Sequence, residues 1–134
     1  MSSLMIGQMS YKFYNTNPHN KLVGDCVIRA ISFLLNKSWD EAFIGVCAKA
    51  FEMKDMPSSN AVWNAYLLDN GFSKNLLPDT CPYCYTVKDF CRDYSRGDYI
   101  LSLNGHVVAV SHGDYYDTWD SGDEVPLFYW RKER

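Results

Sequence analysis

The chain of 134 residues has no apolar run near the roughly 18 residues that a membrane-spanning helix needs. Its opening stretch, MSSLMIGQMS, contains no basic residue and no extended apolar segment, so it does not look like a secretory signal peptide. These absences predict a protein that makes no use of a membrane. We therefore expect it in the cytoplasm.

The sequence also lacks an excess of positive charge. It has 13 Lys and Arg against 16 Asp and Glu, a net charge of -3, and its basic residues are scattered. This distribution argues against nucleic acid as a partner. With 47% hydrophobic residues, the chain can bury a core. Its length favours a single domain over residues 1–134.

Histidine is scarce, with three residues, whereas cysteine occurs five times. An odd number of cysteines without a signal peptide predicts free thiols in a reducing compartment. By default each free thiol is a small buried apolar group. The five are Cys26, Cys47, Cys81, Cys84 and Cys91.

Four helices are expected in the first part of the chain. Asp25 can cap the first, whose apolar residues repeat with the spacing of one helix face. Ser38 stands three residues before Glu41, which is the spacing of a capping box, and Thr86 opens a short last helix. We expect loops over 11–24 and 72–85, and helices over 26–36, 39–53, 59–70 and 86–94.

The last part of the chain has the pattern of β-strands. The segments DYILSL, HVVAVS, DYYDTWD and VPLFYW are rich in β-branched and aromatic residues and are separated by turn sequences. They predict an antiparallel meander of three or four strands over residues 98–131. Helices followed by strands indicate an α+β fold, with the helical part 11–97 packed on one face of the sheet.

Cys26 is the first candidate functional residue, because it stands at the first turn of an expected helix. There its sulfur would lie near unpaired backbone N–H groups and the positive end of the helix dipole. Both stabilise a thiolate, which makes the site suitable for a nucleophile. The neighbouring carboxylate of Asp25 opposes this effect.

His106 is the candidate base, since it begins the strand HVVAV, whereas the other two histidines fall in a loop and a turn. A catalytic histidine needs an acceptor that orients its ring. A two-residue turn at Gly113-Asp114 would place Asp117 on the face of His106. A three-residue turn would place Asp120 directly opposite it, so both carboxylates are candidates.

The order of these residues resembles that of papain-like cysteine peptidases. The segment GDC before an apolar helix is similar to the start of bacteriocin-processing peptidase domains of ABC transporters, and NGHVVAV is similar to their histidine strand. YDTWD resembles the segment that carries the third catalytic residue, with Trp119 as a shielding aromatic. The separation of eleven residues between His106 and Asp117 resembles NlpC-type amidases. The set also looks like a family of small proteins from Firmicutes and their phages; the likeness covers 11–36 and 104–120.

This resemblance implies a papain-like core in which N-terminal helices pack on a C-terminal antiparallel sheet. It implies a thiol-dependent amide hydrolase or acyl transferase that uses Cys26, His106 and Asp117, with a peptide or other amide as substrate and no metal or organic cofactor. Papain-like enzymes add an oxyanion donor six residues before the cysteine. That position holds Asn20, whose amide is one methylene shorter than the usual Gln. Asn17 and the backbone N–H of Cys26 are alternatives.

Two other functions stay open at this point. The same fold could hold an inert Cys26 and bind a partner, for instance a host protein. Alternatively, the CPYC motif from Cys81 to Cys84, with Cys91 nearby, could form a dithiol or part of a zinc site.

Overall fold

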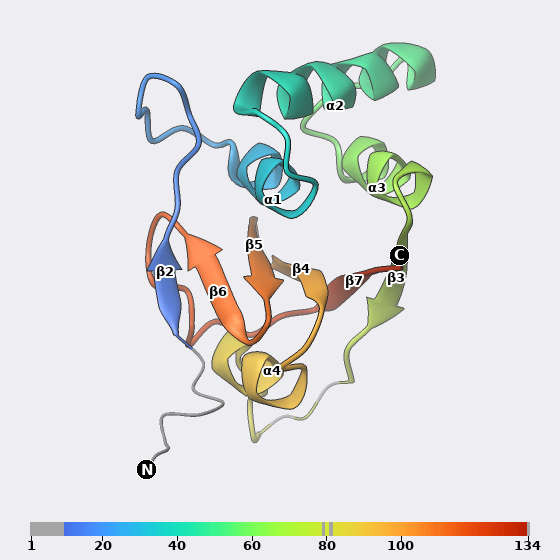
Figure 1. Ribbon diagram of the computed structural model, residues 1–134. Helices are drawn as coiled ribbons and strands as arrows, with labels where there is room; N and C mark the ends of the chain where they lie inside the picture. The colour runs from blue at the N-terminus through green and yellow to red at the C-terminus, as the bar shows by residue number, and fades with distance from the viewer. Residues whose placement is uncertain (1–9, 79, 81, 134) are drawn as a thin grey trace.

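The computed structural model describes residues 10–78, 80 and 82–133 as an α+β fold with a six-stranded mixed sheet. The strands follow the order β2-β6-β5-β4-β7-β3, with β2 and β3 at the two edges (Figure 1). The helices are α1 (Cys26–Leu34), α2 (Trp39–Met53), α3 (Asn60–Asp69) and α4 (Val87–Asp93). The strands are β2 (Tyr11–Phe13), β3 (Phe72–Leu76), β4 (Asp98–Leu103), β5 (His106–Ser111), β6 (Asp114–Asp117) and β7 (Phe128–Lys132).

The expected capping residues start three of the helices. Ser38 Oγ accepts a hydrogen bond from the Glu41 N–H at 3.0 Å, and the Glu41 carboxylate accepts one from the Ser38 N–H at 2.9 Å. Thr86 begins α4 with the same reciprocal pair, and Ser59 caps α3. Since these bonds satisfy N–H groups that a helix start leaves free, they fix where each helix begins.

The predicted sheet is wrong in extent and in direction. Residues 11–13 and 72–76, expected in loops, are strands β2 and β3, so the part assigned to helices also contributes both sheet edges. β2 pairs with β6 in parallel, whereas the predicted sheet was antiparallel throughout. The last strand, β7, lies between β4 and β3 and does not continue the meander beside β6.

The helices cover both faces of the sheet, which corrects the expectation of one covered face. Side chains on a strand alternate between its two faces, and here both sets are buried. The face toward α1, α2 and α3 contributes Ile100, Val107, Ala109 and Trp130 to one core. The face toward α4 contributes Leu101, Val108, Val110 and Tyr115 to a second core with Phe90. Figure 1 shows α1 to α3 gathered together and α4 set apart from them.

Within the described residues, no helix combines the length and the apolar character required to cross a bilayer.

Candidate functional site

The candidate site lies where the start of α1 packs on β5. Cys26 is the first residue of α1, and His106 is the first residue of β5. The N–H of Arg29 donates to the carbonyl of Asp25 at 2.9 Å, which is the first bond of the helix. The N–H groups of Cys26 and Val27 precede that bond, so they have no partner within the helix. The half-buried thiol of Cys26 therefore stands at a positive helix end.

The β5–β6 turn selects the carboxylate that contacts His106. His112 and Gly113 form this turn with φ values of 50° and 84°, and Ala109 pairs with Tyr116. Asp117 therefore comes level with Val108, two residues along β5 from His106. The Nε2 atom of His106 and the Oδ2 atom of Asp117 are 2.6 Å apart, a hydrogen-bonding distance.

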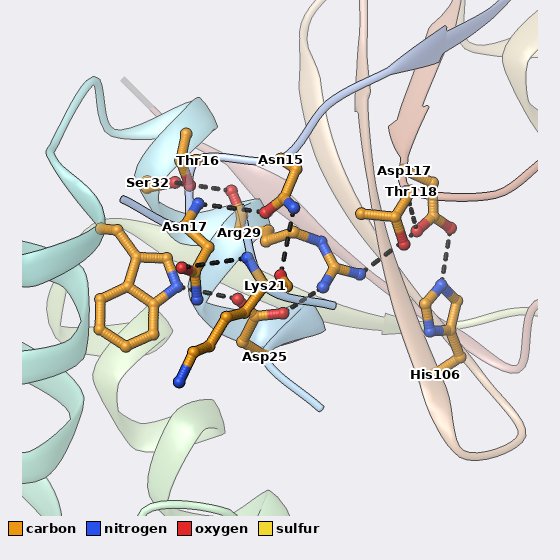
Figure 2. Close-up of polar contacts among 11 residues, drawn as sticks. Asn15, Thr16, Asn17, Lys21, Asp25, Arg29, Ser32, His106, Asp117 and Thr118 are labelled. Carbon is orange, nitrogen blue, oxygen red and sulfur yellow. Dashed lines mark hydrogen bonds and ion pairs between the residues drawn. The ribbon is translucent and has the colours of Figure 1, made fainter. Parts of the chain in front are cut away.

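The Asp117 carboxylate is 2% exposed and has three further donors. Its Oδ2 atom also accepts from the Ser121 hydroxyl at 2.8 Å. Its Oδ1 atom accepts from the Thr118 N–H at 2.8 Å and lies 3.4 Å from Nη2 of Arg29. Figure 2 shows Asp117 placed between Arg29 and His106. Such a set of contacts fixes the carboxylate, and through it the His106 ring.

Asp120, the other candidate carboxylate, is engaged elsewhere. Its Oδ1 atom accepts hydrogen bonds from the Tyr115 hydroxyl and from the Gly122 N–H, the latter at 3.0 Å. Its side chain is exposed and closes the turn after β6. Asp117 is therefore the carboxylate that the fold brings to His106.

Arg29 is the main residue at the site that the sequence reasoning missed. Its guanidinium is buried, and it forms ion pairs with Asp25 through Nη1 and with Asp117 through Nη2. Contrary to expectation, the Asp25 side chain does not cap α1. It instead accepts a hydrogen bond from the indole N–H of Trp39 at 2.9 Å. Two features of the sequence could have identified Arg29. It stands four residues after Asp25, which is the spacing of an ion pair on a helix. It is also the one charged residue among the apolar residues of this helix, and a charge that becomes buried needs a partner.

The surroundings shift the pKa values of Cys26 and His106 in opposite directions. Burial raises the pKa of the Cys26 thiol, but His106, the Val107 N–H and the Arg29 charge lower it, and the net result lies below 9.0. Burial lowers the pKa of His106, but Asp117 and the Cys26 sulfur raise it to about 9. Both shifts act in the direction that favours a thiolate on Cys26 beside a protonated His106.

Trp119, expected as an aromatic wall beside the substrate, packs against His106 but is not among the residues that line the cleft next to Cys26. The two ring centroids are 4.9 Å apart, and the indole is 45% exposed. The ring therefore covers part of the imidazole.

The proposed oxyanion donor Asn20 does not lie at this site. Its side chain is exposed, its backbone has a φ of 56°, and its N–H donates to the carbonyl of Asn17 at 2.9 Å in a turn. The Asn17 side chain accepts from the N–H groups of His19 and Lys21 and so organises the same loop. Of the three candidate donors, the Cys26 N–H is the one beside the thiol.

A cleft of about 660 Å³ opens next to the thiol and the imidazole. One side is formed by the start of α1 and by residues 105–107, and the other by α2 and residues 56–63. Its apolar lining includes Val23, Trp39, Phe43, Met56, Trp63 and Leu103. The cleft gives a substrate direct access to Cys26.

The remaining cysteines do not form a second site among the described residues. No group of three or more metal-ligating side chains occurs there. Cys84 is exposed, whereas Cys91 is buried, and burial together with the Asp114 charge raises the pKa of Cys91 to about 12. Cys81 lies outside the described residues, so the structure does not describe the CPYC motif as a whole.

Comparisons with protein-family models, curated proteins and solved structures give no match to this chain. Its function is therefore inferred from the side chains where α1 meets β5 and β6.

Proposed function

We propose that this protein is a thiol-dependent amide hydrolase or acyl transferase with a papain-like core. One observation carries the proposal: the half-buried Cys26 and His106 line the same cleft, and a buried carboxylate 2.6 Å from Nε2 orients the imidazole, which lowers the pKa of the thiol. A thiol, a base and an acceptor in this order are the parts that covalent acyl transfer requires. The order of Cys26 on a helix and His106 and Asp117 on adjacent antiparallel strands supports the papain-like reading.

In this mechanism the Cys26 sulfur attacks the carbonyl carbon of the amide. The carbonyl oxygen becomes an oxyanion, which the free N–H groups at the start of α1 can stabilise. The carbon–nitrogen bond then breaks, and His106 gives its proton to the leaving amine, which leaves a thioester on Cys26. Water or a second amine attacks the thioester carbon, and His106 takes the proton of that nucleophile. The carbon–sulfur bond then breaks, which releases the acid or the new amide and restores the Cys26 thiolate.

The two nitrogens of His106 have separate tasks. Nε2 is engaged with Asp117, so the proton passes to and from the sulfur through Nδ1. The Asp117 carboxylate keeps that tautomer and stabilises the imidazolium. Since the cysteines that the structure describes are free thiols, a reducing compartment such as the cytoplasm suits this chemistry.

The proposal predicts that p-nitrophenyl acetate acetylates Cys26 selectively. We expect a burst of p-nitrophenolate, followed by slower turnover, and peptide mass spectrometry should find the acetyl group on Cys26. Cys26→Ala should abolish the burst, whereas Cys84→Ala, which removes an exposed thiol outside the cleft, should retain it.

Acetylation of Cys84 as fast as that of Cys26 would contradict the proposal and favour a binding protein. An acetyl group on Cys26 that leaves only when an amine is added would favour acyl transfer over hydrolysis.

A further inference from the structure

Half of the residues that line the cleft beside Cys26 come from parts of the chain that the family resemblance does not cover. One wall comes from α2 and residues 56–63, and Cys26 and His106 line the same cleft. Whatever occupies this wall lies within reach of the reacting atoms. The chemistry of the wall therefore bears on which substrates place an amide at Cys26.

The aromatic residues of this wall, Trp39, Phe43 and Trp63, carry no free polar groups on their rings. Trp39 and Phe43 stack with centroids 4.9 Å apart and ring planes at 9°. The indole N–H of Trp39 is donated to Asp25, and the indole N–H of Trp63 is donated to Asn60 at 2.9 Å. Both indoles therefore offer the cleft an apolar surface and no free donor.

Charge is almost absent from the described lining. Apart from Cys26 and His106, its titratable side chain is Asp25, which is 6% exposed and already bonded to Arg29 and Trp39. A charged substrate group placed against the aromatic rings, away from Cys26 and His106, would lose water and gain no partner of opposite sign, which is unfavourable. An uncharged group avoids this loss.

The apolar wall also continues to the mouth of the cleft. Phe43 is 42% exposed and Met56 is 66% exposed. An apolar substrate group would cover both and gain the free energy of removing that surface from water. The cleft volume of about 660 Å³ lies within the roughly 300–1,000 Å³ that is usual for ligand pockets.

We infer that the site accepts amides that carry a bulky uncharged side chain, aromatic or long aliphatic, and that the Trp39–Phe43 stack selects it. This inference rests on the proposed function, because it assumes that Cys26 reacts with a bound substrate. It goes further by naming the substrate class and the residues that discriminate.

Chloroacetamides test the inference without a known substrate. In each reaction the Cys26 sulfur forms a bond to the methylene carbon and chloride leaves. Chloroacetamide itself is compared with its N-benzyl, N-carboxymethyl and N-(2-aminoethyl) derivatives. For each compound, the rate of labelling at Cys26 is divided by the rate at which the same compound reacts with glutathione. We expect the benzyl compound to label Cys26 roughly tenfold faster than chloroacetamide and to show saturation, and the two charged compounds to show no gain.

Phe43→Ala and Phe51→Ala form a matched pair on α2. Phe51 is 75% exposed and lies outside the cleft. Phe43→Ala should reduce the benzyl preference several-fold, and Phe51→Ala should leave it unchanged.

The two possible failures are distinguishable. If chloroacetamide labels Cys26 faster than Cys84 but the benzyl group gives no preference, or gives one that Phe43→Ala does not reduce, the inference is overturned while the proposed function stands. If Cys26 reacts no faster than Cys84 with any of the compounds, the proposed function fails, and the inference fails with it.

Discussion

Replacing His106 with alanine is expected to slow the alkylation of Cys26 by iodoacetamide at pH 7 by roughly tenfold or more. The thiolate is the reactive form, and His106 is the first of the groups that lower the pKa of Cys26 against the effect of burial. Without the imidazole, burial raises that pKa, opposed by the Val107 N–H and Arg29 alone. The rate is read at Cys26 by peptide mass spectrometry across a range of pH.

The sign of the pH dependence follows from these shifts. In the wild type, labelling should rise as the pH passes a Cys26 pKa below 9.0 and then level off. In His106→Ala the same rise should move to higher pH. His19→Ala is the control, because His19 is exposed in the loop before α1 and should leave the profile unchanged. An identical profile in His106→Ala and the wild type would contradict the proposed pair.

Replacing Arg29 with methionine is expected to lower the free energy of unfolding by about 3 kcal/mol or more. The side chain is buried and lies between two buried carboxylates, Asp25 and Asp117. Removing the guanidinium leaves the buried carboxylates without a compensating charge. The resulting loss of folding free energy is larger than the amount by which the ion pair itself stabilises the protein. Urea unfolding measures the difference.

Arg92→Met is the matched control for Arg29→Met. Arg92 also pairs with two carboxylates, Asp89 and Asp93, but at the surface, where such pairs contribute little. We expect its unfolding midpoint to stay close to that of the wild type. Asp25→Asn combined with Arg29→Met should recover part of the lost stability, because it removes one of the uncompensated charges. Equal effects of the two arginine substitutions would contradict the role given to the buried network.

The sequence predicted best those features that neighbouring residues determine. Ser38 and Glu41 lie within one helical turn of each other, so their bonds form regardless of the rest of the fold. The four interior strands, β4 to β7, were likewise expected from local alternation and turn residues. The edge strand Tyr11–Phe13 was missed because it has three residues and its partner, β6, is more than 100 residues away. Nothing in so short a segment specifies a distant parallel pairing.

The candidate site shows the same division. Cys26 and His106 were predicted because a helix start and a strand start mark them. The choice between Asp117 and Asp120 depended on one turn, which the structure places at His112 and Gly113. Arg29 was missed, since its partner Asp117 lies on another element. Long-range contacts of this kind arise only when α1 docks on the sheet.

The most direct test is an NMR titration of the His106 ring. A thiolate–imidazolium pair predicts that the pKa of His106 lies near 9 in the wild type. It should fall in Cys26→Ala, which removes the anionic sulfur, and in Asp117→Asn, which removes the orienting carboxylate. Asp120→Asn should leave it unchanged, because that carboxylate bonds to Tyr115 and Gly122. If the pKa of His106 lies near the ordinary 6.5 and changes in neither Cys26→Ala nor Asp117→Asn, the result would contradict the thiolate–imidazolium pair and the enzymatic function proposed for it.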